Sequence, residues 1–295
     1  MIDPSLLPTF VAVARAGRIS AAARSLHLSQ PAVTAQVQRL EQALGTPLFV
    51  RSPRGVDLTA AGERLLGYAR EVRRLLDEAE TTLGDRHESG GELLLGASTT
   101  IAAYVLPPVL AAFRAAYPSV SLRLEVANTE RVLAGVVGGE LPLGLVEGHA
   151  RAPGVRLEPF VDDELVVVTA RHSRFRVRTL ADLARVPLLW REPGSGTRAV
   201  VERALRRAGV RRAPLGDDVE LASNEAIVGS VAADLGVAVA SRWVLRAHLA
   251  LGEVVIVPGL DFVVRRTFRF ALPPGGAQGL AAQFVTLGRR SPPVL

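Results

Sequence analysis

Two helical patterns separated by a short break, between Ile19 and Gly45, constrain the fold of this chain more than any other feature. Ser20 is a favourable N-cap for a short Ala-rich helix that ends near His27. Pro31 suits the start of a second helix, because its missing N–H would have no partner there. Apolar residues recur along this second helix at Val33, Val37, Leu40 and Leu44. One face of the second helix is therefore expected to be buried.

The opposite face of the second helix carries uncharged residues that form hydrogen bonds. Gln can donate and accept at once, which matches the edge of adenine, and a helix-turn-helix places such a face in the major groove. An ordinary corner between two helices is the alternative. The residues that we expect to contact DNA here are Ser29, Gln30, Pro31, Thr34 and Gln38.

A β-hairpin wing is predicted directly after the second helix. Two short apolar segments, 48–50 and 56–58, flank a Ser-Pro-Arg-Gly turn. Arg51 and Arg54 lie in or beside the tip, where a phosphate or the minor groove would meet them. A solvated loop with two incidental arginines is the alternative, and the neighbouring helix-turn-helix favours the DNA contact.

A long helix is predicted from its N-cap, Thr59, to about Arg86. Its apolar residues follow a heptad spacing and form a seam at Leu65, Ala69, Val72, Leu76, Ala79 and Leu83. This seam would pack either against the C-terminal part of the same chain or against the same helix of a second copy. Because DNA readers of this type usually bind two half-sites, we favour a dimer.

The segment 20–66, SAAARSLHLSQPAVTAQVQRLEQALGTPLFVRSPRGVDLTAAGERLL, resembles the N-terminal domain of LysR-type transcriptional regulators. The resemblance implies that the protein binds double-stranded DNA and that the long helix joins subunits into a dimer or tetramer. It also implies RNA polymerase as a further partner. Ala35 departs from the pattern, since many members carry a basic residue there, so the resemblance does not carry that DNA contact over.

Strand and helix patterns alternate beyond the Gly-containing stretch 84–91, which predicts an α/β domain with mostly parallel sheets. Two similar halves joined by two crossings resemble the periplasmic-binding-protein-like effector domain of the same family. The expected organisation is a winged helix-turn-helix domain at 1–58, a linker helix and hinge at 59–90, and an effector domain at 91–295, with subdomain I at about 91–162 and 265–295 and subdomain II at about 163–264.

Hydroxyl residues open a helix in each half of the predicted effector domain. Ser98-Thr99-Thr100 and Ser195-Gly196-Thr197 each follow a strand, and a helix N-terminus offers N–H groups and partial positive charge to an anion. Helix capping alone is the alternative for either site. A small anionic effector is therefore predicted in the cleft between the halves, bound by Ser98, Thr99, Thr100, Asn128, Thr129, Glu147, Ser195, Gly196, Thr197, Arg198 and Asn224.

Three segments, 128–132, 143–148 and 191–198, are most similar to the branch of the family that activates carbon-fixation or sulfite-reductase genes. This resemblance implies a small anionic effector, such as a phosphorylated metabolite.

Residues 194–199 also match a dinucleotide-binding fingerprint, G-x-G-x-x-A, with Asp217 and Asp218 about twenty residues beyond. An NAD(P)-binding oxidoreductase is therefore the alternative function. No acid–base or nucleophile–base pair accompanies the motif, which favours a protein that is not an enzyme. A solute-binding protein of a transporter, the third class, would need an export signal and no DNA-binding head.

Composition narrows the remaining classes. The chain has no Cys and five scattered His, so we expect no metal and no cofactor apart from the effector. Its formal charge of +6 comes from Arg alone, which suits phosphate recognition but also follows from a GC-rich genome. The N-terminus does not resemble a signal peptide and no apolar stretch has the length of a membrane helix, so a cytoplasmic location is predicted.

Overall fold

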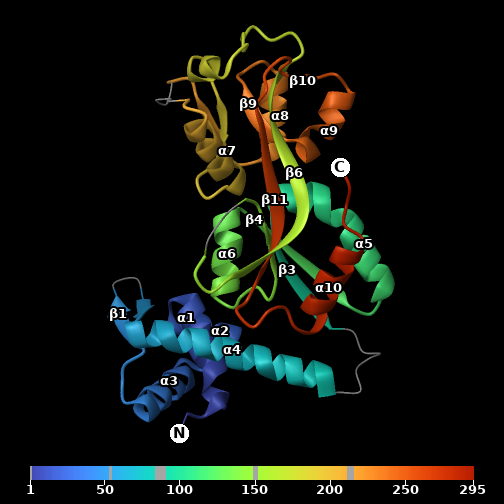
Figure 1. The fold of residues 1–295 in the computed structure, drawn as a ribbon. Helices are drawn as coiled ribbons and strands as arrows, with labels where there is room; N and C mark the ends of the chain where they lie inside the picture. Colours follow the sequence, from blue (N-terminus) through green and yellow to red (C-terminus); the bar gives the residue numbers. More distant parts are fainter. Residues whose placement is uncertain (1, 53–54, 84–90, 149–151, 211–215) are drawn as a thin grey trace. The chain divides into compact units, whose positions relative to one another are not determined.

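The computed structural model describes residues 2–52, 55–83, 91–148, 152–210 and 216–295 (Figure 1). The chain divides into two compact units, residues 1–84 and 85–295, and each is described by itself. Arg54 and the predicted hinge at 84–90 lie outside the described residues, as do the side chains of Ala79 and Leu83.

A winged helix-turn-helix forms the first unit, as predicted. After a 3₁₀ turn at Pro4–Leu6, the elements are α1 (Leu7–Ala16), α2 (Ile19–Ser25), α3 (Gln30–Leu44), β1 (Phe49–Ser52), β2 (Gly55–Leu58) and α4 (Ala60–Leu83). The two strands pair antiparallel as a hairpin. Phe10, Leu40, Leu48 and Leu65 are buried in one apolar core, so the pattern of apolar residues on α3 faces inward as its spacing predicts.

The caps around the turn between α2 and α3 are only partly those predicted. The Ser29 hydroxyl caps α3 by accepting a hydrogen bond from a backbone N–H three residues later, at 3.3 Å. Gly45 ends the helix in the left-handed conformation with a φ of 65°. The prediction for Ser20 is wrong, because α2 begins at Ile19 and its N-cap is the extended Arg18. The chain turns directly after α1 and leaves Ser20 inside the first turn of α2.

The long helix α4 begins where it was predicted to begin. The first three residues of its apolar seam pack on the core of their own unit, which was neither of the two partners considered from the sequence. The Thr59 hydroxyl accepts a hydrogen bond from a backbone N–H of the first turn at 3.0 Å. Leu65 and Ala69 are buried in the core of their own unit, and Val72 is half-buried against it. Leu76, in contrast, is 56% exposed. The first turns of α4 therefore complete the DNA-binding unit.

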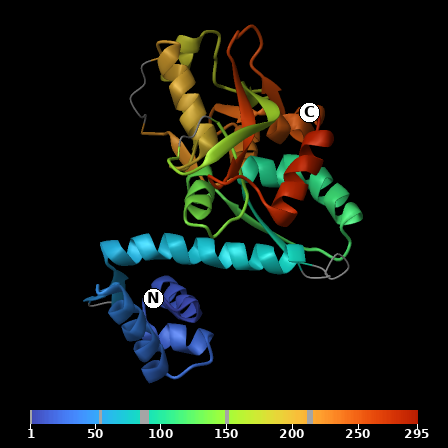
Figure 2. The same cartoon turned by 60° about the horizontal axis from the view of Figure 1, so that its bottom comes forward.

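The first lobe of the second unit contains a parallel sheet and three α-helices. Its elements are β3 (Glu92–Ser98), a π-helical turn at Ile101–Val105, α5 (Leu106–Ala116), β4 (Ser121–Ala127), α6 (Thr129–Val137), β5 (Gly144–Val146) and α10 (Gly279–Arg290). Strand β3 pairs in parallel with both β4 and β5. Helices α5 and α10 lie side by side (Figures 1 and 2), with the ring centroids of Phe113 and Phe284 5.3 Å apart.

The second lobe is built from shorter elements. These are a 3₁₀ turn at Leu180–Ala184, β7 (Leu189–Arg191), α7 (Gly196–Arg207), β8 (Val219–Leu221), α8 (Asn224–Ala232), β9 (Ala238–Ser241), α9 (Arg242–Ala250) and β10 (Val254–Ile256). Strand β7 pairs in parallel with β8, while β9 and β10 pair antiparallel with β6, a strand shared by both lobes.

Two long strands, β6 (Arg156–Ala170) and β11 (Val263–Leu272), run between the lobes (Figure 1). They pair antiparallel, with one register shift between Phe268 and Arg269. The prediction of mostly parallel sheets is corrected here, since the large sheet has the mixed order β10-β6-β11-β5-β3-β4. The chain enters the second lobe along β6 and returns along β11, so the two connecting strands must run in opposite directions.

Candidate functional site

The N-terminal half of α3 presents the polar face that was predicted to read DNA. Ser29, Gln30, Pro31 and Gln38 are exposed, while Thr34 is half-buried and donates its hydroxyl hydrogen to the Gln30 carbonyl at 2.9 Å. The hairpin places Arg51, also exposed, in β1. The folded unit therefore leaves the predicted reading residues open to a partner.

In the second unit, four hydrogen-bond donors converge on one buried side chain, Glu147, which directly follows β5. The Ser98 hydroxyl and the Thr100 backbone N–H donate to its Oε1 at 2.9 and 3.3 Å. The Thr197 hydroxyl and Nη1 of Arg266 donate to its Oε2 at 2.5 and 2.7 Å. We call these four donors the cradle. They hold a carboxylate as an anion site would.

The donors of the cradle come from both lobes. Ser98 and Thr100 lie at the end of β3 in the first lobe, Thr197 lies in the first turn of α7 in the second, and Arg266 lies on β11 between them. This convergence brings together residues that the sequence analysis had placed in two separate helix starts.

A second carboxylate, Asp163 on β6, shares the guanidinium of Arg266. Nε of Arg266 donates to Asp163 Oδ2 at 2.7 Å, and the Ser241 hydroxyl donates to Oδ1 at 2.7 Å. The sequence analysis did not identify these three residues. The signal that could have identified the ion pair is that acidic residues of β6 lie opposite arginines of β11. That signal requires the register of the two strands, which the sequence alone does not give.

The two carboxylates titrate differently. Burial raises the pKa of Glu147, but the charge of Arg266 and the hydrogen bonds of the cradle outweigh it and lower that pKa from 4.5 to about 2. Burial raises the pKa of Asp163, because Arg266 and Ser241 offset the loss of solvation only in part. Glu147 is therefore the firmly charged carboxylate of the pair.

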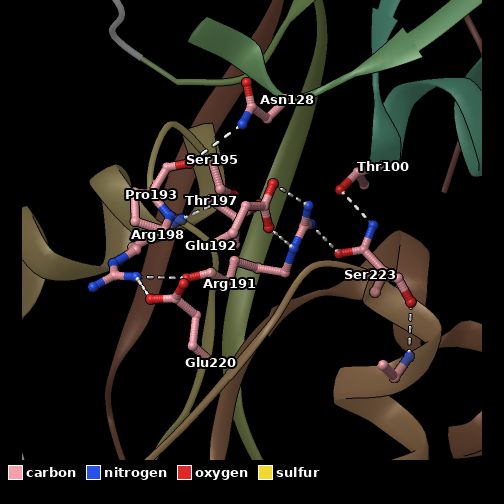
Figure 3. Close-up of polar contacts among 12 residues, drawn as sticks. Thr100, Asn128, Arg191, Glu192, Pro193, Ser195, Thr197, Arg198, Glu220 and Ser223 are labelled. Carbon is pink, nitrogen blue, oxygen red and sulfur yellow. Dashed lines mark hydrogen bonds and ion pairs between the residues drawn. The ribbon is translucent and has the colours of Figure 1, made fainter. Parts of the chain in front are cut away.

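A further chain of contacts links the lobes beside the cradle (Figure 3). The Asn224 side chain, at the start of α8, donates to the Thr100 hydroxyl at 3.1 Å and accepts from Nη1 of Arg191 at 2.7 Å. Arg191 also forms a two-pronged ion pair with Glu192, at 2.8 and 3.0 Å. Arg191 was not predicted as a site residue, although it opens the segment 191–198 that carries the second helix start.

The start of α7 and the loop before it pack tightly against the first lobe. A Cβ at Gly196 would lie 2.5 Å from the Thr129 hydroxyl and 2.8 Å from the Glu147 Cβ, so only glycine fits there. The Asn128 side chain donates to the Pro193 carbonyl at 3.2 Å (Figure 3). These contacts explain the glycine without a bound dinucleotide.

The remaining predicted effector residues have mixed roles. Ser195 caps α7, and the Thr129 hydroxyl accepts from the Glu147 N–H at 3.3 Å. Thr99 is half-buried at the end of β3. Arg198 is engaged elsewhere: its Nε donates to Glu202 at 2.9 Å. Its Nη1 donates to Glu220 at 2.6 Å (Figure 3).

A pocket lies in the second lobe next to the cradle. Its polar lining includes Arg191, Thr197, Arg198, Asn224 and Ser241, and its apolar lining includes Ile227 and Val244. Its volume is about 500 Å³ when the open solvent at its mouth is counted. Thr197 therefore belongs to both the cradle and the pocket wall.

Comparison with known families defines the class of the protein. Residues 4–63 match the family described as "Bacterial regulatory helix-turn-helix protein, lysR family", and residues 86–290 match the "LysR substrate binding domain". The chain belongs to the LysR family of transcriptional regulators and carries an effector-binding domain. It is not an enzyme of the dehydrogenase class, and the fingerprint at 194–199 reflects the close packing at Gly196.

One relative matches this chain over nearly its whole length. A probable RuBisCO transcriptional regulator of Guillardia theta is 33% identical over 279 residues, which cover 92% of this chain and 90% of that protein. This agrees with the resemblance to the carbon-fixation branch.

Two solved structures share the fold. CbnR in complex with its target DNA is 25% identical with a TM-score of 0.64, over 98% of this chain and 99% of that chain. The Synechocystis PCC6803 CcmR regulatory domain in complex with 2-PG is 27% identical with a TM-score of 0.61, over 68% of this chain and 96% of that chain. Within the described residues, no helix combines the length and apolar character that crossing a membrane requires.

Proposed function

We propose that this regulator binds DNA through α3 and the hairpin, and that a small phosphorylated anion bound between the lobes switches it. The observation that carries the effector class is the cradle, in which donors from both lobes surround one carboxylate. Oxygens of a phosphate or carboxylate are the natural partners of such donors. The complex of the related CcmR domain with 2-PG supports the same class of ligand.

The effector position that we propose is the polar end of the pocket beside the cradle. Arg191 and Asn224 line it from the second lobe, and Thr197 joins it to the cradle. A ligand that contacts these residues and the first lobe together would favour one arrangement of the lobes over another.

For the DNA-binding half, exposure of Gln30 and Gln38 and the CbnR complex with target DNA support base reading by α3. We expect the protein to act in the cytoplasm, since a DNA-binding regulator must share a compartment with its promoter. RNA polymerase and self-association into a dimer or tetramer remain predicted partners.

The effector proposal is tested with Thr197→Val in the full-length chain, which keeps the side-chain shape and removes one donor. Isothermal titration with 2-PG, phosphate and sulfate should give saturable binding to the wild type. The variant should lose about 1–3 kcal/mol of binding free energy, because an acceptor is left without its donor. Its DNA affinity should stay unchanged, since Thr197 lies in the effector-binding unit.

Thr286→Val is the matched control, because Thr286 is an exposed hydroxyl on α10. The control should bind 2-PG as the wild type does. Tight binding of a neutral compound that Thr197→Val leaves unchanged would reject an anionic effector.

A further inference from the structure

A side chain of the protein itself occupies the cradle, including the three donors from Ser98, Thr100 and Thr197 that were predicted to bind an effector. Glu147 is 2% exposed, and both of its carboxylate oxygens accept two hydrogen bonds each. A carboxylate accepts about four hydrogen bonds in all, so Glu147 fills the cradle as an anionic ligand would.

Glu147 also joins the two lobes. It follows β5 in the first lobe, whereas its Oε2 partner Thr197 lies on α7 in the second. Among the residues that the structure describes, the other side-chain contacts that join the lobes are neutral or exposed, such as Asn224 to Thr100 and Tyr104 to Glu225. The Glu147 contact is the buried, charged member of this set.

A second anion cannot share the cradle with Glu147. Two negative charges a few Å apart in a buried site repel strongly, and the four donors of the cradle are already bonded to Glu147.

Arg266 has a further N–H group outside the cradle. Its Nη2 is buried without a hydrogen-bond partner among the described residues, and the Arg266 side chain is 0% exposed. The guanidinium can therefore take an additional oxygen from an incoming anion.

We propose that Glu147 is an internal competitor of the effector and sets its charge specificity. This inference rests on the proposed function. An anionic effector takes over the Thr197 hydroxyl and the guanidinium of Arg266, and the released Glu147 carboxylate no longer ties the first lobe to α7. Only a ligand that offers oxygens at least as good as this carboxylate can displace it, which excludes neutral and cationic compounds of similar size.

The test compares full-length wild type, Glu147→Ala and the control Glu130→Gln by isothermal titration with 2-PG and with sulfate. Glu130 is an exposed acid in the first turn of α6 in the same lobe, so its variant removes a similar charge outside the cradle. We expect Glu147→Ala to bind 2-PG about tenfold more tightly than the wild type, a typical size for coupling between two binding events. The control should stay within about twofold of the wild type.

Formate provides an independent readout, because it is a carboxylate without a side chain. It should raise the melting temperature of Glu147→Ala and leave that of the wild type unchanged, since only the variant offers a vacated cradle. If Glu147→Ala does not fold, Glu147→Gln replaces it. The amide keeps the volume and removes the charge, so this variant should also bind 2-PG more tightly than the wild type.

The outcomes separate this inference from the proposed function. Equal or weaker 2-PG binding by both Glu147 variants, with saturable binding by the wild type, would refute the competition and leave the anionic effector intact. Failure of every protein to bind 2-PG and sulfate would refute the anionic effector and the competition together.

Discussion

Single residues determine how the effector site works, and Arg266 shows this most clearly. Its guanidinium is fully buried and pairs with Glu147 and Asp163 at 2.7 Å each. Removing any one of the three would leave a buried charge with fewer partners, which is usually costly. Each of the two carboxylates therefore relies on Arg266 for its charge partner, and Arg266 relies on both carboxylates.

The low pKa of Glu147 makes the stability of the protein depend on pH. A carboxyl whose pKa falls from 4.5 to about 2 on folding stabilises the folded state at pH values above 4.5, and this stabilisation is lost as the pH falls toward 2. The contribution is on the order of 3 kcal/mol. Glu147→Gln lacks it, so urea denaturation should show the wild type's advantage over the variant shrinking between pH 4.5 and 2. An advantage that is constant across this range would contradict the assignment.

Gln30 is the residue whose change should affect sequence reading. It is exposed at the start of α3, so Gln30→Ala should cost about 1–3 kcal/mol on the specific site and little on random DNA. Arg51→Ala is the matched comparison, since a phosphate contact should weaken all sequences alike and lower the salt slope by about one. Fluorescence anisotropy at several salt concentrations measures both. If Gln30→Ala binds specific DNA as tightly as the wild type, the placement of the reading residues is wrong.

At the scale of elements, α4 divides into a part that packs on its own unit and a part that does not. Leu65 and Ala69 complete the core of the first unit, while Tyr68, Leu75 and Leu76 are 70%, 49% and 56% exposed. Tyr68 and Leu75 are one heptad apart, so they share a face of the helix. An exposed apolar face of this kind suits a second copy of α4.

This division predicts which substitution separates subunits without unfolding them. If α4 joins two copies as predicted, Leu76→Asp should dissociate the dimer, because the charge would be buried without a partner at the interface. Leu251→Asp is the control, since Leu251 is 71% exposed at the end of α9. Analytical ultracentrifugation should give a monomer mass for the first variant and the wild-type mass for the second. A Leu76→Asp protein that keeps the wild-type mass would place the interface elsewhere.

Local sequence patterns predicted where the helices and strands lie better than they predicted which elements and side chains pack against each other. The spacing of apolar residues on α3 and the N-cap at Thr59 are properties of residues close in sequence, and the structure confirms them. The heptad pattern of α4 did not specify what covers its seam: Leu65 and Ala69 lie in the core of their own unit, and the dimer stays a prediction. Likewise, Arg266 and Glu147 lie 119 residues apart, and their pairing depends on the register of β11 with β5, the strand that Glu147 follows.

At the scale of the whole molecule, the sequence predicted a DNA-binding unit followed by a two-lobed effector-binding unit. The two helix starts in the lobes were correctly matched to one another, since Ser98, Thr100 and Thr197 meet at one carboxylate. What occupies the site was not predictable, because the fingerprint of an anion site is the same for an internal and an external anion. Burial and distance decide between them, and both are properties of the folded chain.

The pair of long strands that joins the lobes has a mechanical consequence. Strands β6 and β11 are hydrogen-bonded to each other from Val263 opposite Val166 to Leu272 opposite Arg156. Two-stranded ribbons twist more than wider sheets do, so we expect a change in twist to be the easiest deformation of this pair of strands. Loss of a tie between the lobes would therefore appear as a rotation about the ribbon, with the separation of the lobes nearly constant. If the effector acts as proposed, we therefore expect the twist angle between the lobes to change on binding.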